Sequence, residues 1–218
     1  AVAGLITHGD IVIENMPPRE FVSATLHALE TWGAILEWKD ENTLRVRRDR
    51  TKKRPLQITT EPFPGFPTDM QSQVTALLAT TPGTSAIRET IYPERFMHVP
   101  ELNRLGASIK SPEKGRVEIE GVAALEGAAI MAADLRAGAA LALAALAAHG
   151  VSQVRRVYHV ERGYEAIEQK LQGLGASIKR VPETEEDPGL VALMQKLEQE
   201  LQEGHVPLHG TTIDAAGK

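Results

Sequence analysis

One carboxylate stands where this sequence could carry out proton-transfer chemistry. Asp69 lies in PGFPTDMQSQ, residues 64–73, where a proline-rich turn runs into a predicted helix. An acidic residue in the first turn complements the helix dipole, and Thr68 followed by Gln71 is typical of a capping box, so Asp69 could simply begin the helix. A helix N-terminus at the edge of a sheet also commonly faces a ligand. Both interpretations of Asp69, structural and chemical, therefore stay open.

Basic side chains recur at comparable places along the chain. The planar guanidinium group binds carboxylates and phosphates with two parallel hydrogen bonds. Several arginines that converge on one cleft would hold a small, multiply charged anion, whereas scattered arginines would only be solvated. The candidates are Arg19, Arg95 and Arg162 in strand-to-helix loops, and Arg136 at a helix start that Asp134 could cap.

Composition and spacing narrow the classes of protein. The chain has 218 residues, no cysteine and a formal net charge of −5. That charge argues against bulk electrostatic binding to nucleic acid. The lack of cysteine excludes disulfides and thiolate metal sites and makes the cytoplasm the default location. No spacing of His, Asp and Glu indicates a metal site, and neither a glycine-rich phosphate loop nor a serine nucleophile elbow is found. His98 and His159 are expected to be structural.

An internal repeat of about 70 residues predicts the elements that must position these side chains. Gly33, Gly106 and Gly175 each end an amphipathic helix and precede an alanine that begins a strand. Each unit is predicted to run β-α-β-α-β-β, with strands that alternate at period two. The expected fold class is α/β, with three such units forming one inside-out, barrel-like domain over residues 1–181 and the first unit incomplete.

The two ends of the chain depart from the repeat. Residues 182–218 are predicted to form a charged linker, a short amphipathic helix over residues 190–202 and a loose tail. The first residues, AVAGLITHG, are typical of the last turns of an apolar helix. We therefore expect residues N-terminal to Ala1 to be missing.

Five stretches carry a family resemblance. FPTDMQSQ, ERFMHVPEL, GASI, ADLRAGAALALA and YHVERGYEAIEQKLQGLGA closely resemble, in order and over residues 1–181, the UDP-N-acetylglucosamine 1-carboxyvinyltransferases, a family of enolpyruvyl transferases. The related 3-phosphoshikimate enzymes share the fold, but their motifs fit less well. The resemblance implies two inside-out α/β domains, of which this chain is the second, and transfer of enolpyruvyl from phosphoenolpyruvate to the 3′-hydroxyl of UDP-N-acetylglucosamine.

The same resemblance implies a role for each matching residue, without a metal or cofactor. Asp69 would bind the sugar 3′-hydroxyl and take its proton, and Ile91 would contact the UDP-sugar. Arg95 would belong to the charged cluster around the cleft. The DLR junction, Asp134, Leu135 and Arg136, would lie near the reacting centre, and Arg136 and Arg162 would bind phosphoenolpyruvate.

The resemblance also implies what this chain lacks. The family's N-terminal domain supplies a Lys-Asn pair, further arginines and a mobile loop with a general acid, so this chain is expected to hold about half of the active site. We expect little or no turnover unless that domain is present in cis or in trans. Two alternatives stay open: a non-catalytic UDP-sugar-binding or assembly module, and one half of a split enzyme.

Overall fold

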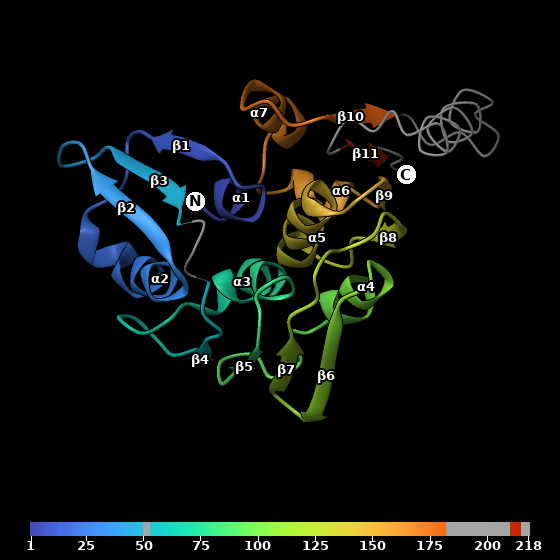
Figure 1. Cartoon of the computed structure of the whole chain (residues 1–218), viewed down its shortest axis with the longest axis horizontal. Coiled ribbons are helices and arrows are strands. Elements are labelled where there is room, and N and C mark those ends of the chain that lie inside the picture. The colour runs from blue at the N-terminus through green and yellow to red at the C-terminus, as the bar shows by residue number, and fades with distance from the viewer. Residues whose placement is uncertain (50–52, 182–209, 215–218) are drawn as a thin grey trace.

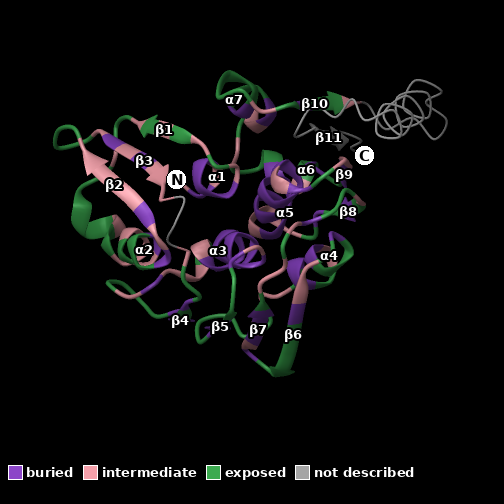
Figure 2. Cartoon of the chain, viewed as in Figure 1, coloured by how far each residue is buried: buried purple, intermediate pink, exposed green. Residues whose placement is uncertain are grey.

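Three helices lie together at the centre of the structure (Figure 1). The computed structural model describes residues 1–49, 53–181 and 210–214. In it α1 (Val2–Ile6), α3 (Gln71–Leu78) and α5 (Leu135–Ala147) contact one another. Figure 2 shows buried residues concentrated on these helices, including every residue of α3. Helix α5 is almost entirely alanine and leucine, and a helix that is apolar all round is buried on all sides.

The first sheet is antiparallel and has the order β1-β3-β2. Its strands are β1 (Asp10–Ile13), β2 (Ala34–Trp38) and β3 (Leu44–Arg48), and α2 (Arg19–Trp32) connects the first two. Trp32, at the end of α2, is buried and donates a hydrogen bond from Nε1 to Thr81 Oγ1 at 2.7 Å. This bond ties the first sheet's helix to the segment that follows α3.

The second sheet has the order β4-β5-β7-β6. Strand β4 (Gln57–Thr59) pairs parallel with β5 (Thr84–Arg88), and β7 (Arg116–Glu120) pairs antiparallel with both β5 and β6 (Ser108–Glu113). The short 3₁₀ turn η1 (Thr68–Met70) leads into α3, and α4 (His98–Arg104) precedes β6. Both helix starts therefore follow a strand of this sheet.

The third sheet is parallel throughout, with the order β10-β11-β9-β8. Its first three strands along the chain are β8 (Ala129–Met131), β9 (Val151–Arg155) and β10 (Ile178–Val181), with α6 (Tyr158–Glu161) and α7 (Ile167–Gly173) between the last two. The fourth, β11 (Gly210–Asp214), lies in the segment for which the sequence predicted a loose tail. The helix predicted over residues 190–202 lies outside the described residues.

The α/β class predicted from the sequence is confirmed, since strands and helices are mixed along the whole described chain. The predicted helix ends are confirmed as well. Gly33, Gly106 and Gly175 follow α2, α4 and α7 with φ of 124°, 86° and 93°, which L-residues with a Cβ rarely adopt. Within the described ranges the strands form three separate sheets rather than one closed barrel. The threefold repeat and the barrel-like arrangement stay predictions. None of the described helices is long and apolar enough to cross a membrane.

Candidate functional site

Two arginines hold the carboxylate of Asp69, which lies in η1 just before α3. Arg136 donates from Nε to Oδ1 at 3.0 Å and from Nη2 to Oδ2 at 2.8 Å, and Arg95 Nη1 donates to Oδ1 at 2.7 Å. The Asp69 side chain is 55% exposed and that of Arg95 is 19% exposed. We call Asp69, Arg95 and Arg136 the Asp69 site. It combines an accessible carboxylate with two cations, a composition suited to acidic or anionic ligands.

The charges of the site change each other's proton affinity. Hydrogen bonding from Arg136, and then from Arg95, lowers the pKa of the Asp69 carboxyl, while partial burial opposes the shift. In turn, the hydrogen bonds to Asp69 raise the pKa of the Arg136 guanidinium. Asp69 is therefore ionised at neutral pH and, while both arginines hold it, is a weak base.

Asp134 sets the position of Arg136. Its Oδ1 accepts hydrogen bonds from the backbone amides of Arg136 at 2.7 Å and Ala137 at 2.8 Å, which confirms the predicted cap at the start of α5. Leu135, between them, packs near Gly163, where an added Cβ would come within 2.9 Å of Leu135 Cδ2. The DLR junction thus joins the start of α5 to the loop after α6.

The predicted capping box at Thr68 and Gln71 is wrong. No side chain caps η1 or α3, and the Gln71 side chain is buried. The Thr68 hydroxyl instead donates to Glu89 Oε2 at 2.8 Å and accepts from Arg95 Nη1 at 3.1 Å. The backbone groups left free at a helix start are N–H donors, but here the lone pairs of the Thr68 hydroxyl meet Arg95 and its proton meets the Glu89 carboxylate. In addition, α3 begins only at Gln71, so Gln71 is not in the third helical position.

Sequence reasoning missed Glu89. Its carboxylate is 2% exposed and accepts from four groups, among them the backbone amides of Ile91 and Tyr92. A signal was present, because Ser85, Ile87 and Glu89 alternate at period two and all face inward. An acidic residue that continues the buried face of a strand must find donors there.

The three other predicted residues, Ile91, Arg162 and Arg19, lie in different surroundings. Ile91 is 46% exposed and lies in the loop that leads to Arg95. Arg162 is exposed at the end of α6, and two residues later the hydroxyl of Tyr164 meets Gln73 Nε2 of α3 at 3.3 Å. Arg19 does not join the Asp69 site, since its guanidinium stacks 4.2 Å above the ring of Trp38.

His98 begins α4 and His159 lies in α6, and both have structural surroundings. His98 is 1% exposed and its Nε2 has no hydrogen-bond partner, and burial lowers its pKa to about 4, so the ring is neutral. His159 stacks against Tyr158 with ring centroids 4.3 Å apart. Within residues 1–49, 53–181 and 210–214, no group of three or more His, Asp or Glu side chains could hold a metal ion.

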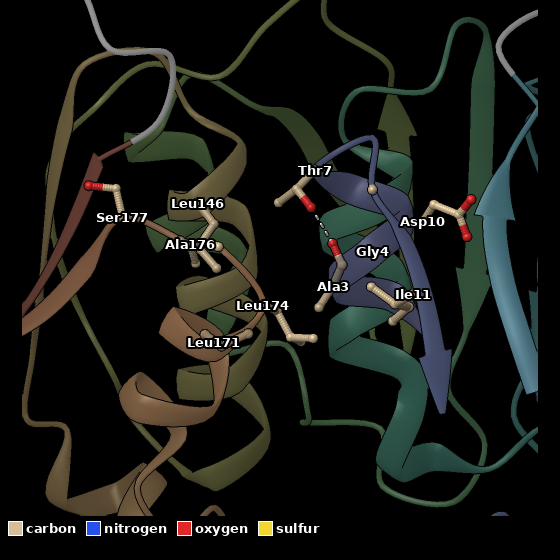
Figure 3. Close-up of a pocket in the computed structure, with 12 residues that line it drawn as sticks. Ala3, Gly4, Thr7, Asp10, Ile11, Leu146, Leu171, Leu174, Ala176 and Ser177 are labelled. Atoms are coloured by element: carbon tan, nitrogen blue, oxygen red, sulfur yellow. Dashed lines mark hydrogen bonds between the residues drawn. The ribbon is translucent and has the colours of Figure 1, made fainter. Parts of the chain in front are cut away.

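A separate pocket of about 350 Å³ lies between α1 and the turn after α7 (Figure 3). Leu146, Leu171 and Leu174 line one side, and Gly4 and Ile11 face them from α1 and β1. None of its lining residues belongs to the Asp69 site. The pocket is mainly apolar, and Asp10, the charged residue in its lining, is paired with Arg45. The Asp69 site is therefore the better candidate for chemistry.

Comparison with known proteins identifies the family of the chain. The sequence profile of EPSP synthase (3-phosphoshikimate 1-carboxyvinyltransferase) matches residues 1–171. The UDP-N-acetylglucosamine 1-carboxyvinyltransferase 2 of Carboxydothermus hydrogenoformans is 47% identical over 180 residues, which are 83% of this chain and 42% of that protein. The UDP-N-acetylglucosamine 1-carboxyvinyltransferase of Geobacter metallireducens is 48% identical over 182 residues, 84% of this chain and 43% of that protein.

A solved structure is similar as well. The enolpyruvyl transferase NikO from Streptomyces tendae superposes with a TM-score of 0.70 and 25% identity, over 80% of this chain and 42% of that one. The chain thus spans less than half the length of each of these relatives. From the profile match, the sequence identity and the shared fold, it follows that the chain belongs to the EPSP synthase family of enolpyruvyl transferases.

Proposed function

We propose that this chain is part of an enzyme that transfers the enolpyruvyl group of phosphoenolpyruvate to the 3′-hydroxyl of UDP-N-acetylglucosamine, in the synthesis of peptidoglycan. The observation that carries the proposal is the exposed Asp69 carboxylate held between Arg136 and Arg95. The names of the relatives support the choice of sugar nucleotide, because over the 182 aligned residues they are 46–48% identical to this chain.

The reaction needs a base for one substrate and cations for the other. Overall, the bond from C2 of phosphoenolpyruvate to the phosphate oxygen breaks and a bond from C2 to the sugar oxygen forms, and the hydroxyl proton leaves with inorganic phosphate. Asp69 accepts that proton from the hydroxyl. Arg136 and Arg95, together with Arg162 at the end of α6, bind the carboxylate and phosphate of phosphoenolpyruvate and stabilise negative charge that develops during transfer.

The ion pair between Arg136 and Asp69 means that phosphoenolpyruvate must engage Arg136 before Asp69 can deprotonate the sugar hydroxyl. While Arg136 binds Asp69 on both oxygens, the carboxylate is a weak base. Phosphoenolpyruvate offers Arg136 a second anion, and the pairing of Arg136 with it releases Asp69. The carboxylate then regains proton affinity next to the hydroxyl that it must deprotonate.

This chain aligns with 42% of the Carboxydothermus hydrogenoformans relative. We propose further that the remaining part of such an enzyme supplies the rest of the site. It would act in cis, or in trans as the other product of a split gene. We also propose that the three sheets derive from one repeated β-α-β-α-β-β unit, from which the third sheet departs because all its strands are parallel. The short span also favours a second candidate, a UDP-sugar-binding or assembly module that does not catalyse transfer.

One experiment separates these candidates. Phosphate release from phosphoenolpyruvate in the presence of UDP-N-acetylglucosamine is measured with the chain alone and with the remaining segment of a relative added or fused. We expect turnover only with that segment, and Asp69→Asn should lower kcat by about two to four orders of magnitude. Asp40→Asn, at an exposed turn after β2, is the matched control. Full activity of Asp69→Asn would contradict catalysis by Asp69, and binding without turnover would favour the non-catalytic module.

A further inference from the structure

Glu89 directly follows β5, and its buried carboxylate contacts Thr68, the residue before Asp69. Oε1 accepts from Thr60 Oγ1 at 2.7 Å and from the backbone amides of Ile91 and Tyr92, each at 2.9 Å. Oε2 accepts from Thr68 Oγ1 at 2.8 Å. Burial of a carboxylate is costly unless donors compensate it, and here four donors meet the two oxygens. The carboxylate therefore acts as a hydrogen-bond acceptor that links three chain segments, at Thr60, at Thr68 and at Ile91–Tyr92.

Hydrogen bonds through Thr68 and Arg95 connect Oε2 of Glu89 to Asp69. A threonine hydroxyl has one proton, and Thr68 uses it on Glu89. The lone pairs of the hydroxyl are then available to Arg95, whose Nη1 donates to Thr68 Oγ1 at 3.1 Å and to Asp69 Oδ1 at 2.7 Å. Glu89 thus sets the direction of a hydroxyl that helps to hold Arg95 against Asp69.

Backbone hydrogen bonds of the loop connect Oε1 of Glu89 to Arg95. The amides of Ile91 and Tyr92 are fixed on Glu89, and the carbonyl of Tyr92 accepts from the amide of Arg95 at 2.9 Å. The Tyr92 ring also lies 5.4 Å from the Arg95 guanidinium carbon. Two independent routes from one carboxylate therefore end at the same arginine.

We infer that Glu89 is a positioning residue that holds Arg95, and through it Asp69, in the geometry of the candidate site. Glu89 is buried and acts through Thr68 and the loop that begins at Ile91. The consequence for catalysis rests on the proposed function. The consequence for the geometry of Asp69 does not, and it can be measured on this chain without substrate.

The test compares variants that cut the Thr68 route with Glu89→Ala, which cuts both routes. Glu89→Gln keeps an oxygen for the Oε1 donors but places an NH₂ group opposite the Thr68 hydroxyl. Thr68→Val removes that hydroxyl, and Thr68→Ser restores it. Thr60→Val is the matched control, because it removes a donor to Oε1 and leaves the Thr68 route intact. The titration of the Asp69 carboxyl is followed by NMR, and hydrogen exchange reports the amides of Ile91 and Tyr92.

A positioning role predicts a specific pattern. In Glu89→Gln and Thr68→Val the pKa of Asp69 should rise, because Arg95 is less firmly held, and the double variant should show no further rise. Thr68→Ser and Thr60→Val should titrate like the unaltered chain. Glu89→Ala should speed exchange of the Ile91 and Tyr92 amides about tenfold, the effect of one lost hydrogen bond.

Unchanged titration of Asp69 in Thr68→Val and Glu89→Gln would overturn the inference. If Glu89→Gln does not fold, Thr68→Val decides alone, since it alters a half-buried side chain of similar volume. In the reconstituted enzyme, Glu89→Gln and Thr68→Val should lower kcat by similar factors, whereas Thr60→Val should not. An enzyme that transfers no enolpyruvyl group would refute the proposed function but leave the NMR result intact.

Discussion

Arg136 and Asp69 are 67 residues apart in sequence and form a side-on ion pair, with Nε 3.0 Å from Oδ1 and Nη2 2.8 Å from Oδ2. Arg136 is in the first turn of α5, and Asp69 is in the turn that leads into α3. The pair therefore joins the beginnings of two central helices at the surface. Because both members are partly exposed, its main effect is on the chemistry of Asp69 rather than on stability.

Removal of the Arg136 charge should make Asp69 a stronger base. In Arg136→Gln the pKa of the Asp69 carboxyl is expected to rise towards its ordinary value, because Arg136 is the largest cause of its lowered pKa. The measurement is NMR titration of the aspartate side chains. Arg104→Gln, which alters an exposed arginine of α4, is the control and should leave Asp69 unchanged. An Asp69 titration that is the same in all three proteins would contradict the ion pair.

Phosphoenolpyruvate should have the same effect on Asp69 without any substitution. If its anionic groups draw Arg136 away, the pKa of Asp69 rises as the ligand is added. The effect should disappear in Arg136→Gln, and sodium chloride at equal ionic strength should not reproduce it. Binding of phosphoenolpyruvate with no change in the Asp69 titration would show that Arg136 keeps its pairing, and the proposed release of the base would then be wrong.

Local signals in the sequence were sufficient for three helix ends and for one cap. Asp134 caps α5 as expected, because its acceptor and the two amides lie within three residues of each other. The glycines after α2, α4 and α7 have the left-handed conformation that their position predicted. In each case the interaction is decided by a few neighbouring residues, so a pattern in the sequence is enough.

The missed features depend on partners that are distant in sequence. The hydroxyl of Thr68 bonds to Glu89 rather than to its own helix, and Asp69, although exposed, pairs with Arg136. Arg19 looked equivalent to Arg95 but stacks on Trp38. A sequence pattern shows which residue types are available in a loop, whereas the tertiary fold decides which charges meet.

The buried His98 should make the protein less stable below neutral pH. Burial lowers its pKa from 6.5 to about 4, so between these values the unfolded chain binds a proton that the folded chain does not. The free energy of unfolding should therefore fall as the pH drops from 6.5 towards 4, by at most about 3 kcal/mol.

Urea denaturation at several pH values measures this loss. His98→Gln should flatten the profile above pH 4.5, whereas His27→Gln, at an exposed position on α2, should keep the slope of the unaltered chain. A profile in which His98→Gln retains the full slope would assign the proton uptake to another group.

Gly138 and Gly173 should respond in opposite ways to alanine. A Cβ at Gly138, in α5, would lie 2.4 Å from Val160 Cγ2 and 3.0 Å from Ala132 Cβ, so α6 must move or Val160 must change its rotamer. Overpacking of this kind costs about 1–3 kcal/mol. At Gly173, in α7, an added Cβ meets nothing within 4 Å, so Gly173→Ala should be neutral or stabilise by up to about 1 kcal/mol. Denaturant midpoints give both values. Because Arg162 directly follows α6, Gly138→Ala should also weaken phosphoenolpyruvate binding in the reconstituted enzyme. Equal binding by both variants would show that the position of α6 does not control Arg162.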